Sequence, residues 1–209
     1  SRLLDCAPRP LREPSHTRHP MTLRLAVDLL MMGFGVSEAV LAMTLRSRSG
    51  ASSATDRGSL RTLWLTISAA IMAAYVVPAY RPLPLPGSGD AYRIAALLLM
   101  TLGLVIRWNA ILTLRRAFTV DVAIAHDQHV VTSGPYRVVR HPSYTGLLLV
   151  FVGMALAHRD AIALLVMLVP ILLAMRYRIH VEEQALTRAF GAEYETYAQR
   201  TKRLLPGVW

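Results

Sequence analysis

The stretch AYRIAALLLMTLGLVIRWNAILTL, from Ala91 to Leu114, is long and apolar enough to cross a lipid bilayer as one helix. The hydrocarbon of a bilayer is about 30 Å thick, and a helix needs roughly 20 residues to cross it. The loop RPLPLPGSGD, from Arg81 to Asp90, precedes the stretch and is dense in proline and glycine, which break a helix. The sequence therefore predicts a membrane-spanning helix that begins at about Ala91.

Four further segments come near the same length. The first contains Asp28 and Glu38 and is the least hydrophobic of them, and the second has Pro78 near its end. The last two are short and are separated only by residues 158–160, which is typical of a tight helical hairpin. We therefore predict an all-α integral membrane bundle of about five transmembrane helices. The four segments run from about Leu23 to Leu45, Leu63 to Tyr80, Ser143 to Ala157 and Ala161 to Arg176.

The composition agrees with a surface that faces lipid. The chain of 209 residues is 54% hydrophobic, and 17% of its residues are charged, against roughly 25% in ordinary soluble domains. The net charge of +10 comes mainly from arginines that flank apolar segments. Nucleic-acid binding proteins instead gather such charge on one face, so we expect an anionic membrane surface and no nucleic-acid partner. The single cysteine, Cys6, excludes an internal disulfide and a cysteine-based zinc site.

The distribution of lysine and arginine predicts the orientation. With the C-terminus in the cytosol, the cytosolic loops hold 14 of the 23 basic residues and the other side holds 8, and cytosolic loops carry the excess of positive charge. The polar regions 115–142 and 178–209 then lie on the cytosolic side, where a water-soluble cofactor would bind. We therefore predict a multi-pass protein of the cell membrane whose C-terminus, together with any active site, faces the cytosol.

The chain divides into three parts on this interpretation. Residues 1–20 are expected to be an N-terminal extension that is disordered or foreign to the native protein, because they are rich in arginine and proline and lack an apolar core. Residues 21–114 form the first three helices, and residues 115–209 form the catalytic region. At its end we expect one amphipathic helix that lies against the membrane or caps the bundle, because apolar residues recur there at helical spacing, namely Leu186, Phe190, Tyr194 and Tyr197.

The segment GPYRVVRHPSYTG, from Gly134 to Gly146, carries the densest group of chemically useful side chains. Proline disfavours the helical region for the residue before it. We therefore expect His141 in extended backbone at the mouth of the fourth helix, with its side chain presented and not buried in a helix. Taken alone, the segment also fits a basic interfacial loop whose tyrosines lie at the level of the headgroups.

A second polar segment, RIHVEEQALTRAFGAEYETYAQR, begins at Arg178. Arg178 and Glu182 are four residues apart and lie on one helix face, and Glu183 is adjacent. The two carboxylates could receive the ammonium group of a sulfonium ligand or accept hydrogen bonds from ribose hydroxyls. The alternative is a surface ion pair that contributes a few tenths of a kcal/mol to stability.

These segments together resemble the isoprenylcysteine carboxyl methyltransferase family. The likeness covers roughly Arg107 to Trp209, while the first two helices are similar only in hydrophobicity. The residues that carry it are RWNAILTLRRAFTVDV, HVVTSGPYRVVRHPSYTG, RIHVEEQALTRAFGAEYETY and the closing RLLPGVW. The combination of RHPSY with the paired glutamates is specific to this membrane superfamily but is a weak guide to the substrate.

The resemblance implies an S-adenosylmethionine-dependent methyltransferase that acts on a lipophilic acceptor, either an isoprenylcysteine-type carboxylate or a similar small lipid. It implies that Arg178 holds the acceptor carboxylate and that Glu182 contacts the cofactor. No obligate protein partner is expected. The other positions that it implies for the cofactor are Gln128, His129, Val130, Val131, Tyr136, His141, Pro142, Ser143 and Tyr144.

The chemistry of methyl transfer demands little of the protein beyond alignment and exclusion of water. A carboxylate acceptor needs no general base, whereas a phenol or an amine needs one, and Glu183, His141 or a nearby tyrosine could serve. Arg107 lies about two turns from the cytosolic end of its helix. There an isolated cation is costly, so Arg107 either lines the acceptor site together with Trp108 or extends to the phosphates.

Two other enzyme classes fit parts of the pattern. A histidine-rich membrane metal oxygenase would use His126, His129, His141 and His180, but the chain has one His-x-x-His pair and no repeated histidine boxes, so no metal site is expected. A NADPH-dependent reductase of the sterol reductase type shares the C-terminal architecture, and fold alone does not fix the reaction. Paired glutamates suit a cationic ligand better than a phosphorylated one.

Overall fold

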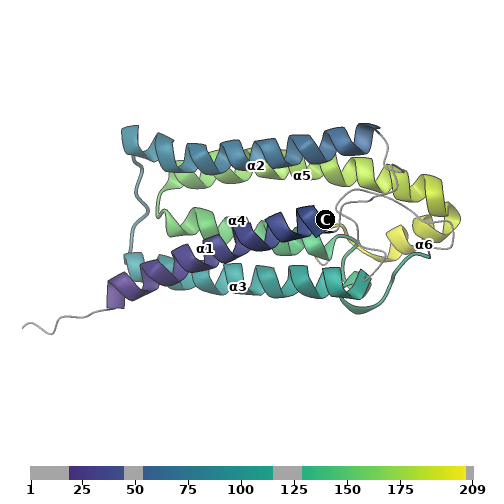
Figure 1. Cartoon of the computed structure of the whole chain (residues 1–209), viewed down its shortest axis with the longest axis horizontal. Coiled ribbons are helices and arrows are strands. Elements are labelled where there is room, and N and C mark those ends of the chain that lie inside the picture. The colour runs from purple at the N-terminus through teal and green to yellow at the C-terminus, as the bar shows by residue number, and fades with distance from the viewer. Residues whose placement is uncertain (1–18, 45–53, 115–128, 206–209) are drawn as a thin grey trace, which may run out of the picture.

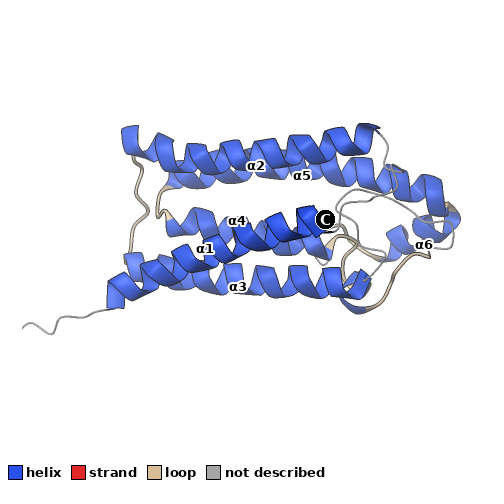
Figure 2. Ribbon diagram, in the orientation of Figure 1, coloured by secondary structure: helices blue, strands red, loops and turns tan. Residues whose placement is uncertain are grey.

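The computed structural model describes residues 19–44, 54–114 and 129–205, and all regular structure in these ranges is helical (Figure 2). Each of the five apolar segments predicted from the sequence forms a helix. Gln128 and His126 lie outside the described residues. The helices in chain order are α1 (His19–Thr44), α2 (Ala54–Tyr80), α3 (Gly89–Leu114), the 3₁₀ turn η2 (Gly134–Arg137), α4 (Pro142–Ala157), α5 (Ala161–Phe190) and α6 (Ala192–Arg200).

Four of the helices, α1, α2, α3 and α5, are long and apolar enough to cross a membrane. The fourth predicted span, α4, has 16 residues and is shorter than a typical crossing helix. The fifth is longer than predicted, because α5 continues beyond Arg176 to Phe190 as one helix. The described residues thus form an integral membrane bundle with one short inner helix.

The helices pack in two pairs. Figure 1 shows α2 and α5 side by side along one side of the bundle and α3 and α4 along the other, with α1 packed across α3. The α3–α4 contact is very close, because a methyl group added to Gly103 would lie 2.5 Å from the carbonyl oxygen of Gly146. Gly153 has the same role one heptad further along α4, against Ala96. Small residues let helix backbones approach closely in membranes.

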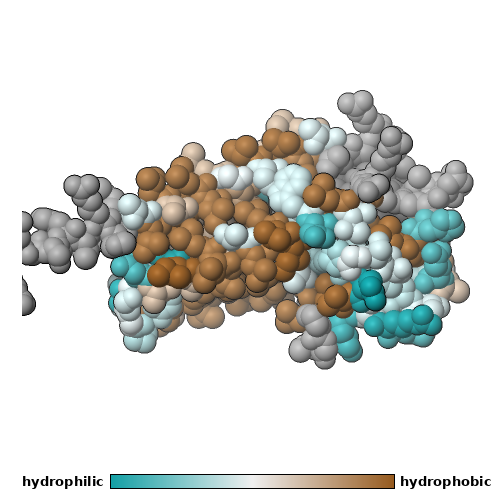
Figure 3. Space-filling view, turned by 90° about the horizontal axis from the view of Figure 1, so that it is seen from below, coloured by the Kyte–Doolittle hydropathy of each residue, from teal (hydrophilic) through white to brown (hydrophobic). Residues whose placement is uncertain are grey.

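The outer surface is divided into an apolar middle and two polar ends. On the face seen in Figure 3, hydrophobic side chains cover the central length of the bundle and hydrophilic ones gather at its ends. Large apolar residues of the bundle are exposed, among them Met32, Leu98 and Leu173. A surface of this kind is stable against lipid and would be costly in water.

The smaller polar end is fastened by Asp160, which caps α5. Its Oδ1 accepts hydrogen bonds of 2.9 Å from the backbone N–H groups of Ile162 and Ala163. Its Oδ2 accepts one of 2.6 Å from Leu83 in the loop between α2 and α3. The turn between α4 and α5 is therefore tied to the α2–α3 loop.

The tail forms two helices and not the one amphipathic helix that the sequence predicts. The helix breaks at Gly191, which has a φ of +52°, so Leu186 and Phe190 end α5 while Tyr194 and Tyr197 belong to α6. A positive φ is accessible to glycine at little cost and ends helices for that reason. The break turns α6 back toward the loop that precedes α4 (Figure 1).

Candidate functional site

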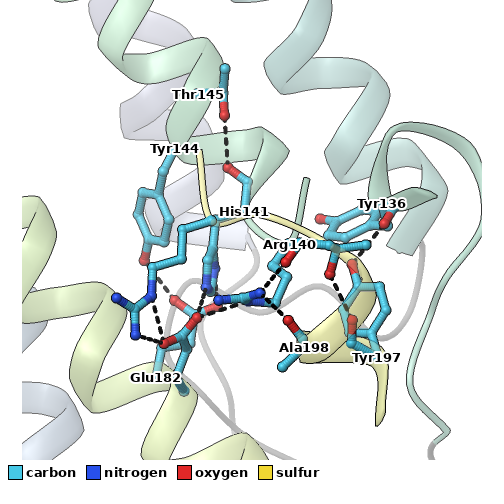
Figure 4. Close-up of polar contacts among 11 residues, drawn as sticks. Tyr136, Arg140, His141, Tyr144, Thr145, Glu182, Tyr197 and Ala198 are labelled. Carbon is cyan, nitrogen blue, oxygen red and sulfur yellow. Dashed lines mark hydrogen bonds and ion pairs between the residues drawn. The ribbon is translucent and has the colours of Figure 1, made fainter. Parts of the chain in front are cut away.

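The larger polar end brings together the Gly134–Gly146 segment, the end of α5, and α6 with the residues after it. Gly134 adopts a φ of +57° and packs against Thr113 at the end of α3. The following turn buries Tyr136, whose carbonyl oxygen accepts a 2.7 Å hydrogen bond from the hydroxyl of Tyr197. The turn is thus held between α3 and α6 (Figure 4).

His141 lies at the N-cap of α4, where the sequence placed it. Its backbone angles, φ −123° and ψ 59°, are outside the helical region, as Pro142 requires. The side chain is only 4% exposed, so the expectation of a presented imidazole is wrong. It lies beside both glutamates: its Nε2 is 3.3 Å from Oε1 of Glu183 and its Nδ1 is 3.8 Å from Oε1 of Glu182.

Both carboxylate oxygens of Glu183 contact positively charged side chains. Its Oε1 accepts a 3.0 Å hydrogen bond from Nε of Arg140, and its Oε2 accepts bonds from Nε and Nη2 of Arg203 at 2.9 and 2.7 Å. Together with His141, these contacts leave the carboxylate little capacity to accept a proton or a ligand. The geometry gives Glu183 a structural role, joining α5 to the loop before α4 and to the tail.

Glu182 is the more exposed of the two neighbouring carboxylates. Its Oε2 accepts a 2.9 Å hydrogen bond from the hydroxyl of Tyr144, and Figure 4 shows it below Tyr144 and His141. The side chain retains 23% exposure. The side chain of Glu183 is 13% exposed, so Glu182 is the carboxylate that a cationic or hydroxyl-bearing ligand could reach more easily.

Arg178 is buried, with 1% exposure, and is therefore not part of a surface ion pair. Its Nε donates to the hydroxyl of Tyr144 at 3.2 Å, and its Nη1 donates to Oγ of Ser59 at 2.7 Å. Tyr144 thus connects Arg178 and Glu182 through its hydroxyl. The Arg178–Glu182 pair and the RHPSY motif, which are far apart in the sequence, meet at this oxygen.

The residues after α6 run alongside the loop before α4. The backbone N–H groups of Arg140 and His141 donate to the carbonyl oxygens of Lys202 and Arg203 at 2.7 and 3.0 Å. Oγ1 of Thr145 donates to the carbonyl oxygen of Leu204 at 2.8 Å. Nη1 of Arg140 also donates to the carbonyl oxygens of Ala198 and Thr201. Residues 198–204 are therefore hydrogen-bonded to the loop before α4 and to the first turn of that helix, and form part of this end of the molecule.

The residues before the turn lie at the edge of the same group. The backbone N–H of Val130 donates to Oε1 of Glu193 at 3.0 Å, and Nδ1 of His129 is 3.9 Å from Oε2 of that residue. The side chain of His129 is 89% exposed, whereas Val130 and Val131 are half-buried. This segment therefore borders α6 and leaves the imidazole of His129 open.

Burial keeps the phenols of the polar end protonated. It raises the pKa of Tyr197 to about 12, although the hydrogen bond with Thr201 and the charge of Arg140 oppose it. Burial also raises the pKa of Tyr136 and Tyr194 above the usual range, assisted by negative charge from Glu182 and Glu183 respectively. None of these three tyrosines is therefore suited to act as a general base near neutral pH.

Arg107 faces the interior of the bundle and does not extend to the headgroups. Its Nε and Nη2 donate to the two carboxylate oxygens of Glu38 on α1, both at 2.6 Å, and its Nη1 donates to Oγ of Ser143 at 2.8 Å. Both charged residues are buried. Trp108 is half-buried.

The comparisons with known proteins agree on the family. A family model described as phospholipid methyltransferase matches residues 91–193. Protein-S-isoprenylcysteine O-methyltransferase A of Arabidopsis thaliana is 31% identical over 184 residues, which cover 86% of this chain and 91% of that protein. The chain belongs to the isoprenylcysteine carboxyl methyltransferase family.

Other relatives extend this result. Isoform B from Arabidopsis thaliana is 36% identical over 114 residues, but the alignment spans only 58% of that protein and 54% of this chain. The solved structure of the eukaryotic intramembrane Ras methyltransferase, an isoprenylcysteine carboxyl methyltransferase, matches with a TM-score of 0.57 and 23% identity. That match covers 90% of this chain and 67% of the other and shows that the two share the membrane fold.

Several residues that build this end of the family fold could not be singled out from sequence. Glu38 only lowers the hydropathy of the first span, Ser59 lies in no motif, and nothing in the second polar segment distinguishes Glu193 from its neighbours. Their roles depend on contacts between helices that are distant in the chain. One signal was available for Glu38: a buried arginine in a membrane helix requires an anionic partner, and the first span offered only two acidic residues.

Proposed function

We propose that this chain transfers a methyl group from S-adenosylmethionine to a lipophilic acceptor, in the first instance an isoprenylcysteine-type carboxylate, at the cytosolic face of a membrane. The proposal rests on the meeting of the RHPSY segment and the Arg178–Glu182 pair at the hydroxyl of Tyr144. Membership of a family of methyltransferases supports it.

The donor set fits the proposed cofactor. Glu182 is partly exposed and could accept hydrogen bonds from the ammonium group or the ribose hydroxyls, and His141 and Tyr144 flank it. The remaining residues proposed to hold the cofactor lie in the same region: His129, Val130, Val131, Tyr136, Pro142 and Ser143. S-adenosylmethionine supplies a methyl group that is already activated by the sulfonium charge. The protein then has to orient the two ligands and keep water out.

The acceptor carboxylate is proposed to bind Arg178. That guanidinium belongs to α5, one of the helices that are long and apolar enough to cross a membrane, and lies next to Tyr144 and Ser59. A carboxylate acceptor requires no base, which agrees with protonated tyrosines and with a Glu183 already bound by Arg140 and Arg203. We expect the acceptor to enter from the bilayer, because its isoprenoid chain is apolar.

Competing classes make different predictions for ligand binding. A reductase on the same scaffold would bind NADPH and not S-adenosylhomocysteine. Within the described ranges, no group of three or more histidine, cysteine, aspartate or glutamate side chains is arranged to hold a metal ion. Unlike the reductase, a methyltransferase should bind S-adenosylhomocysteine. The proposal requires that the purified chain binds this product in detergent with micromolar or tighter affinity.

The decisive experiment measures S-adenosylhomocysteine and NADPH binding by calorimetry, and transfer of labelled methyl from S-adenosylmethionine to an S-prenylated N-acetylcysteine. Glu182→Ala should weaken S-adenosylhomocysteine binding about tenfold or more, because it removes a carboxylate that would bond to the ligand. Arg178→Ala should raise the KM of the acceptor. Glu195→Ala, on an exposed residue of α6, is the matched control. Binding of NADPH alone, or equal affinity in Glu182→Ala, would overturn the assignment.

A further inference from the structure

A buried ion pair joins α1 to α3 within the membrane-spanning part of the bundle. Glu38 is 5% exposed and Arg107 is 7% exposed. The guanidinium and the carboxylate meet through two parallel hydrogen bonds of 2.6 Å. This bidentate geometry is the strongest arrangement of such a pair. Each charge is too costly to bury without the other.

The pair does not end at Arg107. Its remaining terminal nitrogen, Nη1, donates to Oγ of Ser143 at 2.8 Å. Ser143 lies in the first turn of α4, and its neighbour Tyr144 donates to Glu182 on α5. Two consecutive residues of the RHPSY motif therefore connect the α1–α3 side and the α5 side of the proposed site.

The polarity of the Arg107–Ser143 bond is fixed. A guanidinium has only donors, so Ser143 must use an oxygen lone pair, and its hydroxyl hydrogen is left to donate elsewhere. Among the described residues, no contact of Ser143 uses that hydrogen. A hydroxyl that accepts from a cation is a stronger donor, because hydrogen bonds in a chain polarise one another. At the same time, Glu38 neutralises Arg107 and so prevents it from capturing an anion itself.

We propose that Glu38 is a positioning residue of the methyl-transfer site, which acts through Arg107 to fix the Ser143 hydroxyl as a donor to a ligand carboxylate. The inference rests on the proposed function. Two ligands of that reaction carry a carboxylate, namely the amino-acid part of the cofactor and an isoprenylcysteine acceptor. The experiment therefore follows the affinity of each ligand separately.

The test compares Glu38→Gln with Asp28→Asn, which removes an exposed carboxylate from the same helix. The Kd of S-adenosylhomocysteine and the KM of an S-prenylated N-acetylcysteine are measured on the full chain in lipid nanodiscs. One of the two constants should rise about tenfold in Glu38→Gln, the effect of one charge-assisted hydrogen bond, and neither should change in Asp28→Asn. A rise in Kd identifies the cofactor carboxylate as the ligand group, and a rise in KM identifies that of the acceptor. Unchanged constants in Glu38→Gln would overturn the inference.

A second variant separates positioning from folding. Ser143→Ala leaves the Glu38–Arg107 pair intact and should raise the same constant by a similar factor. In the Ser143→Ala background, Glu38→Gln should then add less than about twofold, because both changes remove one interaction. Additive effects on that constant would show that Glu38 and Ser143 act independently of each other and would refute the proposal. If the wild-type chain transfers no methyl and binds no S-adenosylhomocysteine, the proposed function fails instead.

Discussion

Replacement of Gly146 by alanine tests the close contact of α3 and α4. A methyl group at this position would lie 2.5 Å from the carbonyl oxygen of Gly103 and 2.7 Å from the backbone nitrogen of Arg107. Carbon and oxygen atoms in ordinary contact are about 3.4 Å or more apart, so the two helices must separate by nearly 1 Å. Neither obstacle is a flexible side chain, and local repacking cannot relieve the clash.

Overpacking of this kind typically costs about 1–3 kcal/mol. For a chain of this length, each kcal/mol corresponds to roughly 2–4 °C in Tm. We therefore expect Gly146→Ala to lower the Tm by about 3–10 °C in a thermal unfolding assay in detergent. Gly35→Ala on α1 is the matched control, because nothing lies within 4 Å of a methyl group there. Alanine favours a helix over glycine by about 1 kcal/mol, so the control should be neutral or stabilising.

For the reasoning to hold, Gly146→Ala must lower the Tm while Gly35→Ala must not. If Gly146→Ala unfolds at the same temperature as Gly35→Ala, the α3–α4 interface is looser than the structure indicates. Gly103→Ala provides an independent check from the other helix, since its methyl group would meet Gly146 and Val150. Stability of both variants at the wild-type level would refute the account of this interface.

Two further predictions concern the ends of the bundle. Burial raises the pKa of Asp160, but the N–H bonds from Ala163, Leu83 and Ile162 lower it further, so its pKa lies below the usual range. A depressed folded-state pKa contributes stability above the unfolded pKa that is lost as the pH falls. The wild-type Tm should therefore fall between about pH 5 and pH 3 more steeply than that of Asp160→Asn, and parallel curves would contradict this. At the other end, Arg203→Ala removes the contacts of the tail with Glu183. It should speed proteolysis after Arg200 and weaken S-adenosylhomocysteine binding several-fold. Replacement of the exposed Lys202 by alanine should change neither, and equal proteolysis of the two variants would contradict the role of the tail.

The sequence was a good guide to features that depend on local patterns. All five apolar segments are helices, and Pro142 places His141 at the mouth of α4 as expected. The meeting of the RHPSY segment with Arg178 and Glu182 followed from their place on one side of the membrane. These features are determined by hydrophobic length and by the conformational restriction of proline, which a single sequence displays.

Features that depend on contacts between distant helices were missed or wrong. His141 was expected to be presented, but two glutamates from α5 and the tail bury it. Glu183 was a candidate base, and only the structure shows that Arg140 and Arg203 occupy it. The role of Gln128 in cofactor binding and the division of the chain into three parts remain predictions. Hydrophobic patterns do not specify which helices pair, and here α4 packs chiefly on α3 and not on its successor α5.

The pairing of the tail with the loop before α4 also orders the events of biosynthesis. A membrane protein is threaded into the bilayer from its N-terminus while the ribosome is still translating, and all the spans of this bundle precede residue 202. The backbone partners of Arg140 and His141, however, are residues 202 and 203. The bundle can therefore be fully inserted while its larger polar end is still open, and that end closes only after residues 202 and 203 have left the exit tunnel.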